Sequence, residues 1–136
     1  VEAMVVFDPD RAPGLARLRK RGGQLFSKNR YLAAQMLAYL TGGLWRETAT
    51  QANLAARALA DGLRSQGAEI LFPVEANIVF AAWPRATHRR LIAAGAQYHL
   101  WDATLDGDDP EERLTARLVC DWSNTHTDRE TFLDLF

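Results

Sequence analysis

The spacing of apolar residues predicts two helices in the first half of the chain. Residues 29–40 (NRYLAAQMLAYL) are rich in Ala, Leu and Met, which favour a helix. Thr41-Gly42-Gly43 interrupts this pattern. From Leu44 to Gln66 apolar residues then recur every three or four positions, and charged residues occupy the opposite side. Gly67 is a natural C-terminal cap for this second helix. We expect both helices to serve as scaffold, without chemistry of their own.

Two shorter segments precede these helices. Residues 1–7 (VEAMVVF) are β-branched and mostly apolar, and Asp8-Pro9-Asp10 follows, which predicts a strand and then a turn. Residues 15–20 predict a short basic helix ended by Gly22-Gly23. Because a single strand cannot stand alone, the first strand should join a sheet formed elsewhere in the protein. A chain that begins at Val1, inside a strand, is expected to be an internal piece of a longer protein.

After Gly67 the period of the apolar residues changes from that of a helix to that of strands. Strands are predicted at residues 69–72, 76–83, 97–101 and 115–122, and helices at 85–94 and 127–136. The last helix should begin at a capping box formed by Thr127 and Glu130. Residues 102–113 carry six acidic side chains with a Gly and a Pro, and are expected to form a surface loop. The pattern therefore predicts an α+β arrangement, with a helical part (1–66) and a part with an antiparallel sheet and helices on one face (67–136).

Composition is that of an ordinary globular protein. The 136 residues are 48% hydrophobic and 24% charged, enough for one domain or a piece of a larger one. The sequence contains no apolar run of membrane-spanning length and no signal-peptide pattern. The single cysteine, Cys120, excludes an internal disulfide bond and fits a reducing compartment, so a cytoplasmic location is expected.

Positive charge is concentrated near the first glycine pair. Residues 11–30 contain seven Lys or Arg and no acid, although the net charge of the whole chain is only −1. Basic residues beside Gly22-Gly23 suit an anion, above all a phosphate, at a loop-to-helix junction. The alternative is a solvated basic face that leads into a core helix. Binding to nucleic acid is disfavoured, because the overall charge is balanced and exposed aromatic residues do not alternate with the basic ones.

No arrangement of nucleophile, base and acid is apparent among the titratable residues. His88 lies among arginines and is expected to be exposed, His99 to be structural, and His126 to lie at the surface. Their spacing is not that of a metal site, and the acidic loop lacks the ligand order of an EF-hand. Cys120 is expected to be buried and inert. We therefore predict no metal.

Arg117 interrupts an otherwise apolar strand (LTARLVCDW). An arginine in such a strand is costly unless it lies at an edge or binds something, and its guanidinium suits a carboxylate. The pattern is consistent with two interpretations of Arg117: an exposed arginine on a strand, or an arginine that binds a ligand.

Five segments, in order, resemble the C-terminal part of low-specificity threonine aldolases. They are EAMVVF, GGQLFSKNRYLAAQMLAYL, GGLWRETATQANLAARALADGL, FPVEANIVF and ARLVCDW. The most specific are GQLxSKxRxLAAQ at residues 23–35 and PVEAN at residues 73–77. These proteins are β-eliminating lyases that depend on pyridoxal phosphate and share the α/β fold type I of aspartate aminotransferase. The resemblance implies that residues 1–66 end the cofactor-binding large domain and that residues 67–136 form the small C-terminal domain.

The resemblance also implies an activity and a set of site residues. The expected reaction is cleavage of β-hydroxy-α-amino acids, such as L-threonine, to glycine and an aldehyde, with pyridoxal phosphate as the electron sink. Arg117 matches the arginine that binds the substrate α-carboxylate. Ser27, Lys28 and Arg30 fall in the segment that approaches the cofactor phosphate of a neighbouring subunit, which implies a homodimer or homotetramer.

The Schiff-base lysine of the family has no match here. The only lysines are Lys20 and Lys28, and neither falls at its position. No catalytic residue is therefore assigned, and this chain alone is expected to be inactive. Gln51 stands where relatives often carry histidine, and the acidic loop 102–113 resembles an insertion. Because of these two differences, the resemblance does not determine the substrate preference. The alternatives are another pyridoxal-phosphate lyase of the same fold and a non-enzymatic α/β module that binds an anion or nucleic acid.

Overall fold

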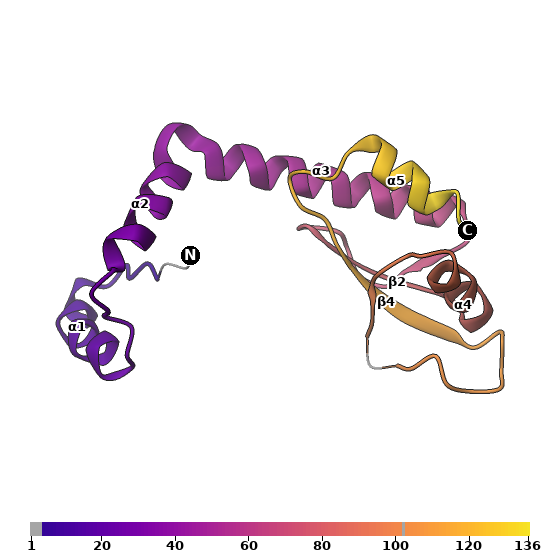
Figure 1. Cartoon of the computed structure of the whole chain (residues 1–136), viewed down its shortest axis with the longest axis horizontal. Coiled ribbons are helices and arrows are strands. Elements are labelled where there is room, and N and C mark those ends of the chain that lie inside the picture. The colour runs from indigo at the N-terminus through magenta and orange to yellow at the C-terminus, as the bar shows by residue number, and fades with distance from the viewer. Residues whose placement is uncertain (1–3, 102) are drawn as a thin grey trace. The chain divides into compact units, whose positions relative to one another are not determined.

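The computed structural model describes residues 4–101 and 103–136. The chain divides into two compact units, Val1–Trp45 and Arg46–Phe136, which we call the first and second unit (Figure 1). Sequence patterning placed a boundary at residues 66–67 instead. The division falls earlier because the long helix that follows Thr41–Gly43 packs against the sheet and so belongs, from Arg46 onward, to the second unit.

The first unit is helical. Its elements are η1 (Pro9–Arg11), α1 (Ala12–Arg21), α2 (Asn29–Leu40) and η2 (Thr41–Gly43). Helix α2 has the predicted bounds, and α1 extends beyond the predicted residues 15–20 at both ends. Gly42 and Gly43 end the α2 region because they adopt positive φ angles of 66° and 82°, which only glycine reaches without strain.

The strand predicted at residues 1–7 is not found where the structure can test it. Residues 1–3 lie outside the described residues, and residues 4–7 have no strand conformation. Met4 and Phe7 are 81% and 93% exposed. A strand needs a partner for its backbone N–H and C=O groups, and no segment of the described chain pairs with this one.

The second unit is a four-stranded antiparallel sheet with helices. Its elements are α3 (Leu44–Ser65, from Arg46 on), β1 (Glu69–Ile70), β2 (Ile78–Pro84), α4 (Arg85–Ala93), β3 (His99–Leu100), β4 (Arg113–Val119) and α5 (His126–Leu133). The strand order is β1-β2-β4-β3, and every neighbouring pair is antiparallel. The predicted antiparallel sheet is confirmed, with shorter edge strands than the pattern indicated.

Alternation along β2 and β4 creates a core face and an outer face of the sheet. The core face carries fully buried side chains such as Val79, Trp83 and Ala116. Three helices cover this face with buried leucines from α3, α4 and α5, namely Leu63, Leu91 and Leu133. The prediction of helices on one face is therefore confirmed for this unit.

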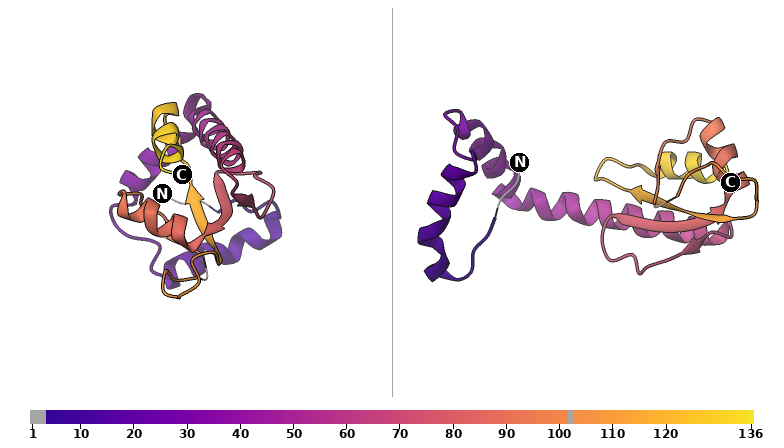
Figure 2. Two further views of the ribbon diagram at one scale, coloured as in Figure 1. Left: turned by 90° about the vertical axis from the view of Figure 1, so that its right-hand side faces the viewer. Right: turned by 90° about the horizontal axis from the view of Figure 1, so that it is seen from below.

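Helix α5 lies alongside α3 (Figure 2). The contact occurs at Gly62, where an added Cβ would lie 2.3 Å from the Leu133 Cδ1 atom. The capping box of α5 involves Thr125 and Asp128 and not the predicted Thr127 and Glu130: the Thr125 hydroxyl accepts from the Asp128 backbone N–H, and the Asp128 carboxylate accepts from the Thr125 N–H. The earlier threonine caps the helix because it has the extended backbone that an N-cap requires.

Two arginines of α4 hold the acidic loop that precedes β4. Arg85 is 3% exposed; its Nη1 forms an ion pair with Glu112 Oε2 at 2.7 Å and donates to the Asp109 carbonyl at 2.7 Å. Arg89 donates to the Leu105 and Gly107 carbonyls at 2.8 Å. The loop is therefore tied to α4 along its described length. Among the helices that the structure describes, none has both the length and the apolar character needed to cross a bilayer.

Candidate functional site

Arg117 lies on the outer face of the sheet, away from the core. It is in β4, which pairs with β2 on one side and β3 on the other. Its direct cross-strand neighbours are Phe80 and His99. Because β4 is an interior strand, an edge position does not account for this arginine, and the ligand-binding alternative gains support.

The surroundings of Arg117 are aromatic. Its guanidinium carbon lies 5.8 Å from the centroid of the Trp101 ring. The Trp101 ring in turn packs edge-on against Phe80, with centroids 5.3 Å apart. The Arg117 side chain is half-buried, and its Nε is covered and has no hydrogen-bond partner. Leaving a buried N–H without a partner costs about 1–3 kcal/mol, which the packing around Arg117 has to offset.

Arg113 provides a comparison on the same strand and the same face. Its Nη2 donates to the Ala82 carbonyl at 2.7 Å and to the Gly67 carbonyl at 3.2 Å, and its Nε lies 3.9 Å from a Glu69 carboxylate oxygen. Arg113 is thus occupied by the fold. In the described part of the chain the Arg117 side chain has an aromatic contact but no hydrogen bond or ion pair with the protein. Its terminal nitrogens are free to bind a carboxylate through two parallel hydrogen bonds.

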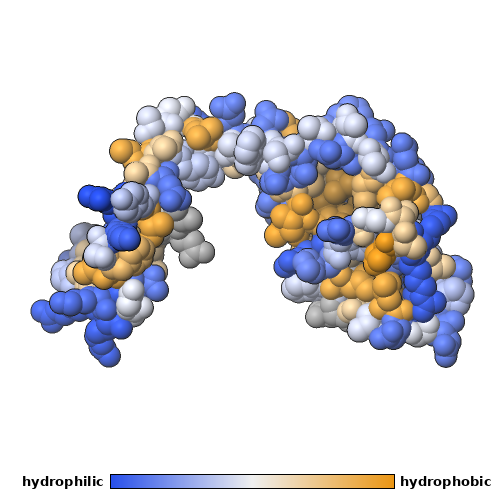
Figure 3. Space-filling model, in the orientation of Figure 1, coloured by the Kyte–Doolittle hydropathy of each residue, from blue (hydrophilic) through white to orange (hydrophobic). Residues whose placement is uncertain are grey.

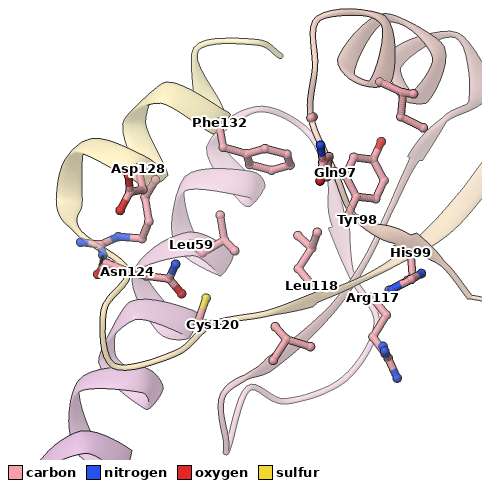
Figure 4. A pocket seen from close by; sticks show the side chains of 14 residues that line it. Leu59, Gln97, Tyr98, His99, Arg117, Leu118, Cys120, Asn124, Asp128 and Phe132 are labelled. Atoms are coloured by element: carbon pink, nitrogen blue, oxygen red, sulfur yellow. Dashed lines mark hydrogen bonds between the residues drawn. The ribbon is translucent and has the colours of Figure 1, made fainter.

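A pocket of about 700 Å³ opens beside this site at the C-terminal end of β4. Its apolar wall comes from Leu59, Leu118, Cys120 and Phe132. In Figure 4, Arg117 and its neighbour His99 point away from this apolar wall. Cys120 is buried as predicted, and burial raises the pKa of its thiol. The thiol therefore stays protonated at neutral pH and is not a nucleophile.

The expectation that His88 is exposed is wrong. His88 is completely buried, and its ring stacks on Trp83 with centroids 4.4 Å apart. Its Nε2 lies 2.9 Å from the Leu114 carbonyl, so Nε2 carries the proton, and Nδ1 accepts from the Tyr98 hydroxyl at 2.9 Å. Burial lowers the pKa of His88. His88 was predicted to be exposed because its neighbours in the sequence are arginines, but its position on α4 faces the sheet.

The other two histidines have no buried role. His99 is exposed beside Arg117, and His126 is exposed at the start of α5, as predicted for His126. Among the residues that the structure describes, no group of His, Cys, Asp and Glu side chains could hold a metal ion.

Ser27, Lys28 and Arg30 lie in the first unit, at the N-terminus of α2. Lys28 is the N-cap residue, and no side chain caps this end of the helix. All three residues are exposed, and the Arg30 guanidinium lies over the Tyr31 ring at 5.1 Å. A helix N-terminus without a side-chain cap, with basic side chains beside it, suits a phosphate, so these residues fit that part of a pyridoxal phosphate.

Sequence reasoning did not identify Phe80 and Trp101 as site residues. The signal that could have identified Trp101 is its alternation with His99 in the predicted strand 97–101, which places both side chains on one face. What could not be read from the sequence is that this face is the one that carries Arg117, because that depends on the pairing of β3 with β4.

The sequence is similar to those of known proteins. The chain is 34% identical over 122 residues to the low-specificity L-threonine aldolase of Pseudomonas aeruginosa, covering 89% of this chain and 33% of that protein. It is 32% identical over 122 residues to the corresponding Pseudomonas sp. protein, with the same coverage. The chain thus spans about a third of the curated relatives that it matches.

The fold has a solved counterpart. The structure of Leishmania major threonine aldolase superposes with a TM-score of 0.77 at 20% identity, over 90% of this chain and 34% of that one. At this identity the likeness concerns the fold alone. No family model matches the sequence.

Proposed function

Because this chain is homologous over 89% of its length to low-specificity L-threonine aldolases, we propose that it supplies the substrate-carboxylate side of a pyridoxal-phosphate enzyme. The complete enzyme would cleave β-hydroxy-α-amino acids such as L-threonine to glycine and an aldehyde. The chain spans about a third of its relatives, and we propose this reaction for the complete enzyme.

The observation that carries this proposal is the guanidinium end of Arg117 on an interior strand, which has no hydrogen bond or ion pair with the described residues. A planar guanidinium with two parallel donors matches a carboxylate. By holding the α-carboxylate, Arg117 orients the amino acid so that the Cα–Cβ bond stands in one direction relative to the rest of the site. Such fixed orientation lowers the barrier because the entropic cost is met on binding.

The cofactor would be held in part by the first unit. Ser27, Lys28 and Arg30, with the N-terminus of α2, would bind its phosphate group. When bound, pyridoxal phosphate supplies an electron sink for the carbon–carbon cleavage. Neither Lys20 nor Lys28 matches the cofactor-anchoring lysine of the family, so this chain by itself would be inactive. We further propose that the complete enzyme is a homodimer or homotetramer, which would cover the exposed apolar side chains of the first unit.

A chimera tests the carboxylate role. This chain would replace the homologous third of the Pseudomonas aeruginosa L-threonine aldolase, and cleavage of L-threonine would be measured. We expect an active chimera in which Arg117→Ala lowers kcat/KM about 10- to 150-fold, mainly through KM, because a hydrogen-bonded charge pair contributes about 1.5–3 kcal/mol. The control is Arg64→Ala, which removes an exposed arginine of α3 and should leave KM unchanged. A KM unaffected by Arg117→Ala would refute the role.

A second experiment tests the absence of an anchoring lysine in the chain itself. The 136-residue chain would be incubated with pyridoxal phosphate, reduced with sodium borohydride and mapped by peptide mass spectrometry. We expect no stoichiometric adduct at a single site. A clean adduct at Lys28 would mean that the basic segment is itself a cofactor-anchoring site.

A further inference from the structure

We propose that Trp101 is a positioning residue, which holds the Arg117 guanidinium so that a carboxylate binds through its two terminal nitrogens. This inference rests on the proposed function, because it takes Arg117 as the carboxylate-binding residue. Trp101 would not touch the carboxylate itself. Its position would determine the side from which the carboxylate reaches Arg117.

Trp101 is itself fixed with respect to β4. Its backbone N–H donates to the Thr115 carbonyl at 2.7 Å, and Thr115 precedes Arg117 by two positions on the same face. The Trp101 ring is also held from the side by Phe80, and Phe80 packs edge-on against Phe72 with centroids 5.5 Å apart. Backbone pairing and a row of aromatic rings therefore restrain the ring that lies 5.8 Å from the guanidinium carbon.

The covered Nε determines the direction of approach. Because Arg117 Nε is buried, its N–H is not available to a ligand. A carboxylate can then reach the guanidinium only at the end that carries the terminal nitrogens, where two parallel hydrogen bonds form. A covered Nε alone does not mark a binding residue, since Arg85 Nε is also buried without a partner. The two arginines differ at the terminal nitrogens.

An aromatic neighbour leaves those terminal nitrogens free. Arg85 is held by the Glu112 carboxylate and the Asp109 carbonyl, which occupy its Nη1. An indole ring attracts a guanidinium through its face but accepts no strong hydrogen bond. Trp101 can therefore restrain Arg117 without competing with a ligand for its donors. Restraint before binding reduces the conformational entropy lost on binding, which raises affinity.

The test uses nuclear magnetic resonance of the complete chain, with the Arg117 side-chain signals assigned. Sodium acetate, the simplest carboxylate, would be titrated against sodium chloride at matched ionic strength. We expect acetate to shift the Arg117 signals, and we expect Trp101→Leu to weaken this interaction about two- to fivefold, the factor that corresponds to about 0.5–1 kcal/mol for an exposed cation–π contact. Trp101→Phe retains a ring and should restore most of the affinity.

Trp122→Leu is the matched control. Trp122 is 65% exposed and follows β4, so its replacement removes the same side chain from the same unit and should leave the acetate affinity unchanged. An affinity that is equal in wild type and Trp101→Leu would overturn the positioning role while leaving the proposed function intact. Acetate without effect on wild-type Arg117 would instead refute the carboxylate role, and the proposed function with it.

Loss of structure is separated from loss of positioning by the backbone amide signals of β2 and β4. If Trp101→Leu shifts these signals throughout the sheet, the comparison passes to Phe80→Leu, which keeps Trp101 but removes the ring against which it packs. A weaker acetate affinity in that variant supports the positioning role. An affinity equal to wild type would overturn it.

Discussion

The two units of this chain form helices equally well but differ in what they bury. In the second unit the helices cover a sheet, and side chains such as Ala56, Leu63 and Leu91 are fully buried. In the first unit no described residue, from 4 to 45, is buried. Many of its large apolar side chains are exposed instead, namely Met4, Val5, Phe7, Leu18, Leu25, Phe26, Tyr31, Leu37, Tyr39 and Leu40.

This difference shows that local helix signals and a core are separate requirements. Helix α2 is apolar around most of its circumference, and such a helix is stable when other polypeptide surrounds it. The first unit instead leaves an open pocket of about 750 Å³ lined by apolar side chains that include Leu15, Phe26 and Met36. Hydrophobic surface is accordingly visible on this unit in Figure 3. We propose that other polypeptide covers this surface.

The largest predicted effect contrasts one leucine from each unit. Leu63→Ala leaves a cavity in the core of the second unit and should lower the free energy of unfolding by about 2–5 kcal/mol. Leu37→Ala in α2, where Leu37 is 70% exposed, should change it by no more than about 0.5 kcal/mol. Urea denaturation of both variants measures the two values. Equal losses would show that the first unit has a core of its own.

A second contrast uses two helical glycines, whose replacement by alanine should change the stability in opposite directions. Gly62→Ala places a Cβ 2.3 Å from Leu133 Cδ1, and we expect a net loss of stability of about 1–2 kcal/mol, because overpacking outweighs the gain in helix propensity. Gly14→Ala in α1 meets no atom within 4 Å and should be neutral or stabilising by up to about 1 kcal/mol. Thermal unfolding of the two variants tests the signs. A stabilising Gly62→Ala would mean that α5 moves away from α3 at little cost.

The smallest predicted effect is a pH dependence confined to the second unit. Burial lowers the pKa of His88 below its ordinary value of 6.5, so the unfolded chain binds a proton more readily than the folded one. The free energy of unfolding should therefore fall as the pH drops below about 6.5, by at most about 1.4 kcal/mol per pH unit. Burial also raises the pKa of Tyr98 to about 12, so its hydroxyl remains a donor to His88 throughout this range.

The control for this pH dependence is His126, which is exposed. Denaturation curves at several pH values between about 5 and 8 should show the slope in wild type and in His126→Gln, and a smaller slope in His88→Gln. A slope that persists unchanged in His88→Gln would assign it to another group.

Much of the secondary structure could be predicted because it depends on neighbours in the sequence. The bounds of α2 were predicted from composition and from Gly42-Gly43, and α3 from its apolar period and Gly67. The α5 cap was placed two residues late, because Thr125 and Thr127 are both followed by an acid three positions later and only the backbone conformation distinguishes them. The strand predicted at residues 1–7 failed in its described part because a strand depends on a partner, which local pattern does not supply.

The sequence alone determined which residues could form helices, that strands and helices both follow Gly67, and that Arg117 is a charged residue in an otherwise apolar strand. Each of these follows from periodicity or from the cost of a charge among apolar neighbours. Only the tertiary structure decided that His88 is buried, that Arg117 is on an interior strand, and that Trp101 lies against it. The reason is physical. These facts depend on strand order and register, which join residues distant in sequence, whereas periodicity reports only which side of an element a residue occupies.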